Sequence, residues 1–418
     1  MITFNAMTKE SGEVQVNGSI YEQEDFIYSY GWNRVMMHAI GGWPEENDNF
    51  FMKNRIFINC LALILFVILP QSAGMAVFWG DLNAFIGAFL VNLAVNVSFL
   101  KIFWIGIQRS TVEHLLKMMA EDWLMEKTLE EHQEMMKMTK LVRLISSLSF
   151  YGTLALFTAY VSAQILLGFE LRDDPNVDPR LSIGFLYTCV FPFDTSSLAV
   201  FIPIWLVQFF FTYVSMAGYS SPDSFLGMFV FHQCGQLKLL RRRLERIVDE
   251  ETIGSPRKFW EKLGKLVMRH EHLNERASEI EEEFNKVFLA IVLICILTTC
   301  TQGFTLITLL EETEGGFPVL QMIFLLVFTT YDLGHFFMYC MAGDILITES
   351  SSIGVSLYNS QWCNLAPNER KSILILTSRC VIPQQITGGK FTILSLPLFA
   401  NVVKTAASYL SVLLAMKV

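Results

Sequence analysis

Charged residues are scarce in this sequence. Asp, Glu, Lys and Arg make up 17% of the 418 residues, against roughly 25% in an average soluble domain. Hydrophobic residues make up 52% of the chain, which is more than a soluble fold usually carries. We therefore expect an integral membrane protein, and the net charge of -9 gives no indication of nucleic-acid binding.

The common catalytic motifs are also absent. The sequence contains no glycine-rich phosphate loop and no Gly-x-Ser-x-Gly segment. The nearest zinc-like segment, His270-Glu271-His272, lacks a second histidine four residues after His270, which a helical metal site needs. We expect neither an enzyme nor a bound metal or other cofactor.

Three further absences narrow the class of protein. The eight cysteines show no paired spacing, so they predict neither a disulfide framework nor a metal site. The N-terminus lacks a charged segment followed by a short apolar core and a cleavage site, so we expect no cleaved signal peptide. No internal repeat is present, which argues against a transporter built from inverted repeats.

Long apolar runs are what the sequence does contain. Seven of them are long enough to cross a membrane, at about 20 residues for each crossing. They are Ile56–Phe78, Leu82–Ile107, Leu144–Leu167, Ser197–Met216, Phe288–Leu309, Val319–Met341 and Phe391–Met416. The predicted fold is an all-α polytopic membrane protein with seven transmembrane helices.

The charges between the spans predict their orientation. Most of the Lys and Arg residues lie between spans two and three, four and five, and six and seven. The loops on the other side carry only Arg172 and Arg180 among many acidic residues. By the positive-inside rule, the N-terminus is cytosolic and the C-terminus is extracellular.

Polar segments divide the chain into four parts. Residues 1–55 form a cytosolic N-terminal segment with a membrane-surface helix, and residues 56–342 hold the first six spans. Residues 108–143 and 219–287 keep a helical period, with a break at Ser221-Pro222-Asp223, and predict a cytosolic helical bundle. A loop with a short helix (343–390) and the last span (391–418) follow. The proline-containing loop 168–196 is expected to lie over the outer mouth as a lid.

Aromatic residues gather in the outer halves of the spans. Each alone is typical of contacts between helices or with lipid, but together with two small residues they predict a pocket for an apolar ligand. The predicted pocket residues are Phe85, Phe89, Ser149, Gly152, Tyr160, Phe201, Trp205, Phe209, Phe324, Phe328 and Tyr331.

Ionisable residues inside spans are rare and usually functional. Asp332 and His335 lie in span six, and Lys404 lies in the last span. At about 1.5 Å of rise per residue, Asp332 and Lys404 are each roughly 21 Å from the outer end of their spans. They predict an ion pair, which either couples span six to the last span or only fixes how the two helices pack.

The outer end of the last span carries a stripe of residues at helical spacing. Ser408, Val412 and Met416 share one face. Repeated around an oligomer axis, such a stripe would form rings, and an apolar ring can close a pore by dewetting. A plain seam between two helices is equally compatible with the same spacing.

An ordered set of residues in the last third of the chain resembles the insect odorant receptor family. The set comprises Gly343-Asp344, Ser350-Ser351, Val355, Tyr358, Trp362, Arg379, Pro383, Thr387-Gly388-Gly389-Lys390-Phe391, Ser395-Leu396, Phe399, Val403-Lys404-Thr405 and Ser408-Tyr409. The resemblance implies a nonselective cation channel that a small volatile molecule opens, assembled as a heterotetramer with a shared co-receptor.

The resemblance also implies roles for parts of the chain. The last span would line the pore, the short helix before it would lie in a cytosolic anchor, and odorants would bind in the outer half of spans two to six. Val412 and Met416 match the family's gate, with methionine in place of the more usual leucine. The stretch between spans four and five is shorter than in the co-receptor, which implies a ligand-tuned subunit in the plasma membrane of a sensory dendrite.

Two alternatives stay open at this point. A gustatory-type receptor channel belongs to the same superfamily, but the Thr-Tyr and Gln-Phe pattern of its last span is absent here. A G-protein-coupled receptor also has seven spans, but its Asp-Arg-Tyr and Asn-Pro-x-x-Tyr motifs are missing and its N-terminus would be extracellular.

Overall fold

Helices make up almost the whole of the described chain. The computed structural model describes residues 24–44, 50–171, 178–311 and 319–417. The α-helices are α1 (Glu24–Ile40), α2 (Phe50–Leu63), α3 (Leu69–Met75), α4 (Leu82–Ile107), α5 (Arg109–Leu124), α6 (Leu129–Leu171), α7 (Leu198–Glu245), α8 (Glu250–Ile253), α9 (Pro256–Glu311), α10 (Val319–Asn359), α11 (Pro367–Arg379) and α12 (Leu396–Lys417). A π-helical turn, η2 (Ile64–Ile68), and two 3-10 turns, η3 (Ala76–Phe78) and η4 (Trp362–Asn364), join some of them, and β1 (Thr387–Gly388) pairs antiparallel with β2 (Thr392–Ile393).

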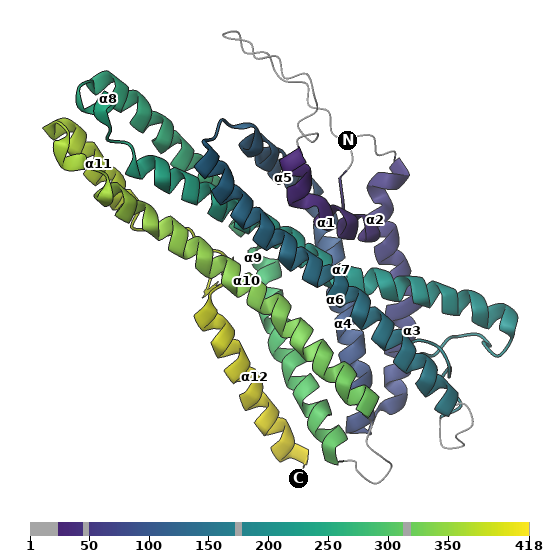
Figure 1. Ribbon diagram of the computed structural model, residues 1–418. Coiled ribbons are helices and arrows are strands. Elements are labelled where there is room, and N and C mark those ends of the chain that lie inside the picture. The colour runs from purple at the N-terminus through teal and green to yellow at the C-terminus, as the bar shows by residue number, and fades with distance from the viewer. Residues whose placement is uncertain (1–23, 45–49, 172–177, 312–318, 418) are drawn as a thin grey trace.

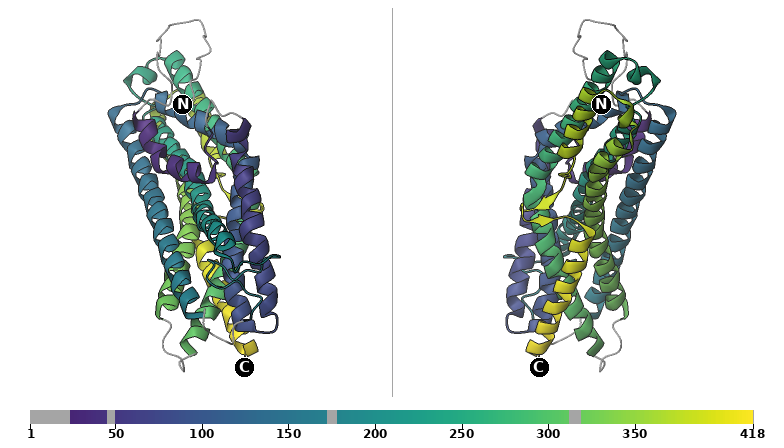
Figure 2. Two further views of the ribbon diagram at one scale, coloured as in Figure 1. Left: turned by 90° about the vertical axis from the view of Figure 1, so that its right-hand side faces the viewer. Right: turned by 90° about the vertical axis from the view of Figure 1, so that its left-hand side faces the viewer.

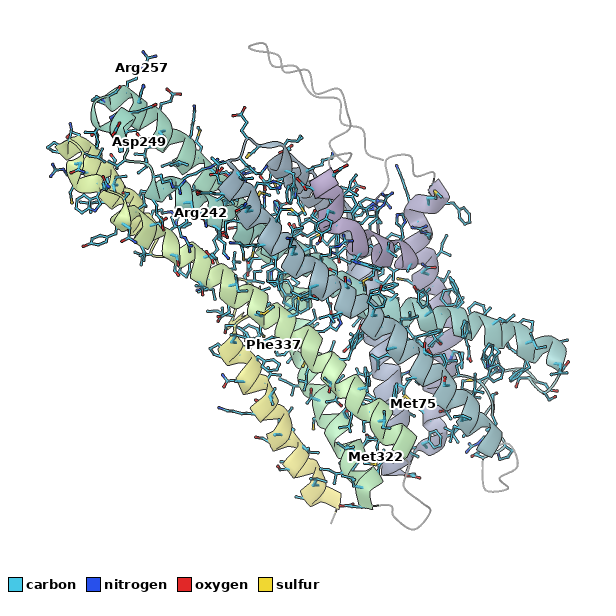
Figure 3. The ribbon with its side chains drawn as sticks, viewed as in Figure 1. Met75, Arg242, Asp249, Arg257, Met322 and Phe337 are labelled. Atoms are coloured by element: carbon cyan, nitrogen blue, oxygen red, sulfur yellow. The ribbon has the colours of Figure 1, made fainter. Side chains whose placement is uncertain are left out.

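The helices form one elongated bundle. The helices α8 and α11 lie at one end of it, and the last turn of α12 lies at the other (Figure 1 and Figure 2). Figure 3 marks the same two ends by Arg242 and Asp249 on one side and by Met75 and Met322 on the other. Helix α7 is central, because it packs against α1, α4, α6, α9 and α10.

Six described helical segments are long and apolar enough to cross a membrane. They are Phe50–Phe78, Ala84–Ile107, Leu129–Gly168, Leu198–Glu245, Pro256–Glu311 and Met322–Asn359, and they contain the cores of the first six predicted spans. Helix α12 corresponds to the seventh, but it includes residues whose side chains lie outside the described part of the chain. Seven spans, and the sides on which the termini lie, remain predictions.

Helix α7 corrects the predicted break at Ser221-Pro222-Asp223. The helix runs without interruption for 48 residues, with Pro203 and Pro222 inside it. All three residues of the predicted break are buried. Contacts with the surrounding helices therefore outweigh the local cost of a proline within a helix. At about 1.5 Å per residue α7 is roughly 72 Å long, more than twice the thickness of the hydrocarbon core of a bilayer.

The predicted amphipathic extensions of α7 and α9 are present. Their apolar stripe is buried at Phe229, Leu237, Leu263 and Leu273. Val267, which the same period placed on this face, is 39% exposed. Three consecutive arginines of α7 are half-buried in ion pairs with the neighbouring helices: Arg241 with Glu349, Arg242 with Glu134, and Arg243 with Glu131.

A buried carboxylate joins α5, α7 and α9 near the α8 end. Asp122 is 1% exposed and accepts hydrogen bonds from Arg269 Nη2 at 2.6 Å and from Arg276 Nη1. His232 Nε2 lies 2.8 Å from the same carboxylate. Burial acts to raise the pKa of Asp122, but the His232 hydrogen bond and the two arginine charges outweigh it and hold the pKa well below its usual range. The carboxylate therefore stays ionised and ties the three helices together.

The chain before α12 forms a tight hairpin. Gly389 and Lys390 both have a left-handed backbone, with φ of 63° and 65°, and Gly389 N–H donates to the Asn285 carbonyl at 2.9 Å. Because β2 occupies Thr392–Ile393, the last helix begins at Leu396, five residues later than the predicted start of its span at Phe391.

Within the predicted lid loop, residues 178–196 enter the bundle. Leu186 and Cys189 are 1% and 0% exposed, and the Val190 N–H donates to the Pro70 carbonyl at 3.0 Å. A Cβ atom at Gly74 would lie 2.3 Å from the Thr188 carbonyl oxygen, so only glycine lets the loop approach α3 this closely.

This close approach predicts the result of one substitution. Gly74→Ala should lower the free energy of unfolding by about 1–3 kcal/mol, because the methyl group overlaps backbone atoms that cannot rotate away. Thermal unfolding of the purified protein in detergent measures this change. Gly264→Ala is the matched control, since open space surrounds a Cβ atom at that position of α9. Equal midpoints for the two variants would contradict the proposed contact.

Candidate functional site

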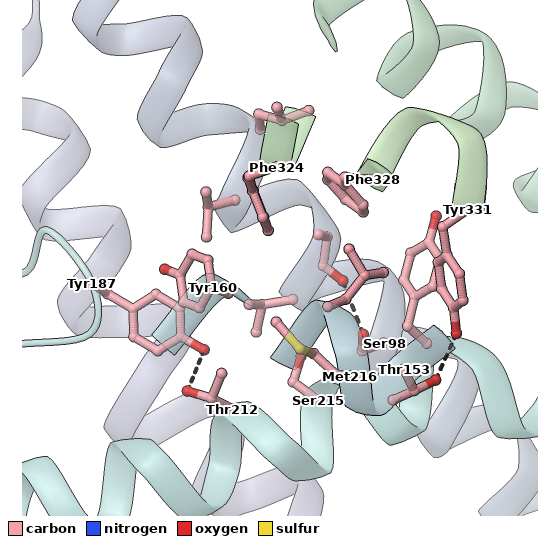
Figure 4. Close-up of a pocket in the computed structure, with 16 residues that line it drawn as sticks. Ser98, Thr153, Tyr160, Tyr187, Thr212, Ser215, Met216, Phe324, Phe328 and Tyr331 are labelled. Atoms are coloured by element: carbon pink, nitrogen blue, oxygen red, sulfur yellow. Dashed lines mark hydrogen bonds between the residues drawn. The ribbon is translucent and has the colours of Figure 1, made fainter. Parts of the chain in front are cut away.

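A cavity of about 80 Å³ lies between four of the long helices (Figure 4). Residues of α4, α6, α7 and α10 form its wall, and one loop residue, Tyr187, closes it. The lining residues are Leu90, Val91, Ala94, Val95, Ser98, Thr153, Leu156, Tyr160, Tyr187, Thr212, Ser215, Met216, Tyr219, Phe324, Phe328 and Tyr331. Helical spacing explains the set, because residues three or four apart on one helix share a face.

The cavity is chemically apolar although several hydroxyl groups line it. The Ser98 hydroxyl donates to the Ala94 carbonyl at 3.0 Å, and the Thr212 hydroxyl donates to the Gln208 carbonyl at 2.6 Å. Both hydroxyl groups already donate within their own helices. A ligand would therefore gain little binding free energy by accepting hydrogen bonds from them. The site suits a small, mostly apolar molecule, and its volume is below the roughly 300–1,000 Å³ of typical ligand sites.

Two tyrosines close the loop side of the cavity. The Tyr160 hydroxyl donates to the Leu186 carbonyl at 2.7 Å, and the Tyr187 hydroxyl lies 2.8 Å from Thr212 Oγ1. Their ring centroids are 5.9 Å apart. Figure 4 shows both rings at one side of the cavity, with the Tyr187–Thr212 hydrogen bond drawn between them and α7.

Tyr331 forms the opposite side. Its hydroxyl lies 2.6 Å from Thr153 Oγ1 and donates to the Ser149 carbonyl at 3.2 Å. The Thr153 hydroxyl lies 2.7 Å from Ser220 Oγ, which extends the hydrogen-bond chain to α7. A Cβ atom at Gly152 would lie 2.6 Å from Tyr331 Cε2. The ring is therefore seated against the bare backbone of α6.

Four of the predicted pocket residues line this cavity: Tyr160, Phe324, Phe328 and Tyr331. Ser149 and Gly152 lie behind Tyr331 and support its position rather than lining the space. The other five, Phe85, Phe89, Phe201, Trp205 and Phe209, do not line it.

Those five aromatic residues contact other rings instead. Phe85 stacks on Phe89, Trp205 stacks on Phe209, and Phe201 packs against Phe185 of the loop. They were predicted from their depth in the membrane, and depth does not determine the direction in which a side chain points.

The prediction missed the small and polar lining residues, including Ser98, Thr153, Thr212 and Ser215. Thr153, Leu156 and Tyr160 recur at helical spacing on α6, and this period was the available signal. Tyr187 could not be found in this way, because it lies in an irregular loop.

A buried polar network lies against the cavity at Tyr219. Lys101 Nζ is 2.8 Å from Asp223 Oδ2 and donates to the Tyr219 carbonyl at 2.9 Å. The Tyr339 hydroxyl donates to Asp223 Oδ1 at 2.8 Å, and His335 Nδ1 lies 3.2 Å from Asp223 Oδ2. Lys101 and Asp223 are 7% and 1% exposed, so this ion pair is almost fully buried. The prediction overlooked Lys101, which lies inside the predicted span two, and treated Asp223 only as part of a helix break.

The predicted ion pair between Asp332 and Lys404 is wrong. Asp332 accepts hydrogen bonds from the Tyr219 hydroxyl and from Thr298 Oγ1, the latter at 2.5 Å, and it is 4% exposed. Lys404 is exposed on α12. Similar depth made a contact between the two possible, but Asp332 points into the bundle toward α7 and α9, whereas Lys404 points away from it.

Helix α12 buries one face and exposes another. Val402 and Ala406 are 3% and 1% exposed, whereas Val412 is 56% exposed. Ser408 is also exposed, and its hydroxyl donates to the Lys404 carbonyl at 3.0 Å. The side chain of Met416, the second predicted gate residue, lies outside the described part of the chain. The buried face contacts α9 and α10.

Comparison with known proteins gives consistent matches. The family model described as 7tm Odorant receptor matches residues 81–407. Odorant receptor 13a of Drosophila melanogaster is 26% identical over 249 residues, which cover 55% of this chain and 57% of that protein. The odorant receptor coreceptor of Aedes aegypti is 29% identical over 171 residues, covering 40% of this chain and 33% of that protein. The chain thus spans little more than half the length of the first relative and a third of the second.

The fold also matches a solved structure. The insect olfactory receptor OR5 from Machilis hrabei, in complex with eugenol, superposes with a TM-score of 0.72 at 15% sequence identity. The match covers 94% of this chain and 100% of that one. At this identity the likeness concerns the fold alone.

Proposed function

The chain belongs to the insect odorant receptor family, and we propose that it is a ligand-tuned subunit of an odour-gated, nonselective cation channel. The family is one of receptors rather than enzymes. The described residues include six helices of membrane-spanning length, so the chain is a multi-pass membrane protein, and we place it in the plasma membrane of a sensory dendrite.

The apolar cavity among α4, α6, α7 and α10 carries this proposal. Its wall is mostly aromatic and aliphatic, and the hydroxyl groups of Ser98 and Thr212 already donate within their own helices, which suits a small volatile molecule. The space of about 80 Å³ is smaller than a typical ligand pocket, so we expect binding to move side chains apart. A ligand that binds the expanded state better shifts the population toward that state.

A chain of contacts supports coupling between the cavity and α12. Tyr219 lines the cavity, and its hydroxyl donates to Asp332. Asp332 also accepts a hydrogen bond from Thr298 of α9, and α9 packs against α12. We assign Asp332 a coupling role through this route. Lys404 does not pair with Asp332 but lies on the exposed face of α12. We propose that it couples the subunits by contacting a neighbouring subunit there.

The exposed face of α12 is the proposed pore lining. In a heterotetramer with the co-receptor, the faces bearing Ser408 and Val412 would surround one axis, and Val412 and Met416 would form the gate. An apolar ring at that position excludes water and cations until the helices separate. The exposure of Val412 in the single chain supports this assignment.

Patch-clamp recording tests the proposal. Cells should express the chain with and without the co-receptor, and a panel of volatile alcohols, esters, ketones and phenols should be applied. We expect a cation current that depends on at least one panel compound and requires the chain. Cells expressing the co-receptor alone are the control, and equal currents in both would refute the proposed function.

A further inference from the structure

A second and larger cavity lies beside the first. It has a volume of about 450 Å³ and is bounded by the end of α6, the turn after η3 and the described part of the lid loop. Trp79, Gln164 and Ser182 are among the residues that line it. Its volume falls within the range of typical ligand sites, whereas the inner cavity does not. A small organic molecule therefore fits here without any rearrangement.

The two cavities share one lining residue. Tyr187 lines both of them and is 4% exposed. We propose that the larger cavity is a vestibule that binds the apolar ligand first, and that Tyr187 is the gate through which the ligand passes to the inner cavity. This inference rests on the proposed function, because it concerns how the same ligand reaches its site.

The backbone around Tyr187 is fixed while its side chain is held by one polar contact. The Leu186 carbonyl accepts a hydrogen bond from the Tyr160 hydroxyl. The Cys189 carbonyl accepts a hydrogen bond from the Ser182 N–H at 3.1 Å. The Tyr187 hydroxyl has Thr212 Oγ1 as its partner at 2.8 Å (Figure 4). Because the Thr212 proton is donated to the Gln208 carbonyl, Tyr187 is the donor in this pair. Rotation of the ring thus breaks one hydrogen bond and leaves the loop in place.

The geometry predicts a kinetic effect with little change in affinity. Tyr187→Phe keeps the ring and removes the hydrogen bond that closes the gate. The loss of one such bond should speed both the onset and the decay of the current about threefold to tenfold during brief ligand pulses. The odorant concentration for half-maximal current should change less than twofold, because the rates of ligand entry and exit change together. A role of Tyr187 in binding alone would change the half-maximal concentration instead.

Thiol labelling of the vestibule is the second test. In a Cys363→Ser background, which removes an exposed native thiol, S182C places a thiol in the vestibule. A membrane-impermeant, biotin-tagged methanethiosulfonate applied outside intact cells should react there, and the biotin attached to the chain measures the reaction rate without any current. Where an odorant current is present, the reaction should also slow its onset several-fold. The panel compound with the largest current, or 1-octanol if none gives a current, should slow the reaction at least threefold. S197C is the control, since Ser197 makes the same serine-to-cysteine change at an exposed position at the start of α7 that does not line the vestibule.

The outcomes separate the two proposals. If the unmodified chain gives no odorant current, the proposed function fails. The labelling rates still show whether the larger cavity binds 1-octanol. If odorants evoke currents but Tyr187→Phe leaves onset and decay unchanged, Tyr187 is not the gate. If neither 1-octanol nor any panel compound slows labelling of S182C relative to S197C, the larger cavity is not a ligand vestibule.

Discussion

Replacing Lys101 by methionine should destabilise the protein by about 3–5 kcal/mol, because it leaves the buried carboxylate of Asp223 without its cation. Methionine nearly matches the length of the lysine side chain, so the change removes charge with little change in volume. For a chain of this size the expected shift of the thermal midpoint in detergent is roughly 3–6 °C downward.

Lys404→Met is the matched control for this prediction. It makes the same chemical change on an exposed lysine of α12 and should alter the free energy of unfolding by no more than about 0.5 kcal/mol. Adding Asp223→Asn to Lys101→Met should recover part of the loss, since a neutral amide is cheaper to bury than a carboxylate. Equal midpoints for Lys101→Met and Lys404→Met would show that the buried pair does not stabilise the bundle.

Gly152→Ala should raise the odorant concentration for half-maximal current by about fivefold to a hundredfold. The new methyl group would lie 2.6 Å from Tyr331 Cε2 and 3.0 Å from Cδ2, so the ring must move into a cavity of only about 80 Å³. Overpacking of this kind costs about 1–3 kcal/mol, and 1.4 kcal/mol corresponds to a tenfold change in affinity.

The control for this substitution lies on the neighbouring helix. Gly334→Ala adds the same methyl group to α10 at a position with open space around it, and should leave the odorant response unchanged. Concentration–response curves should be compared at matched surface expression of the two variants. If Gly152→Ala responds as Gly334→Ala does, Tyr331 is not part of the ligand site.

The sequence by itself determined the class of protein and the approximate positions of its long helices. Runs of about 20 apolar residues require membrane spans, and the continued helical period beyond them required long extensions. The order of small and aromatic residues in the last third was sufficient to indicate the family. These features are local, because each depends on residues within a few turns of one helix.

The tertiary structure decided which faces of these helices meet. Helical periodicity groups Thr153 with Tyr160 and places Lys404 and Asp332 at similar depths, but it does not show which helix lies opposite each face. Lys101 pairs with Asp223 across 122 positions of the sequence, and Asp332 points toward Tyr219 rather than toward α12. Tyr187 reaches both cavities because the loop that carries it folds back between α3, α6 and α7. Contacts of this range depend on how the whole bundle assembles, and no single helix contains that information.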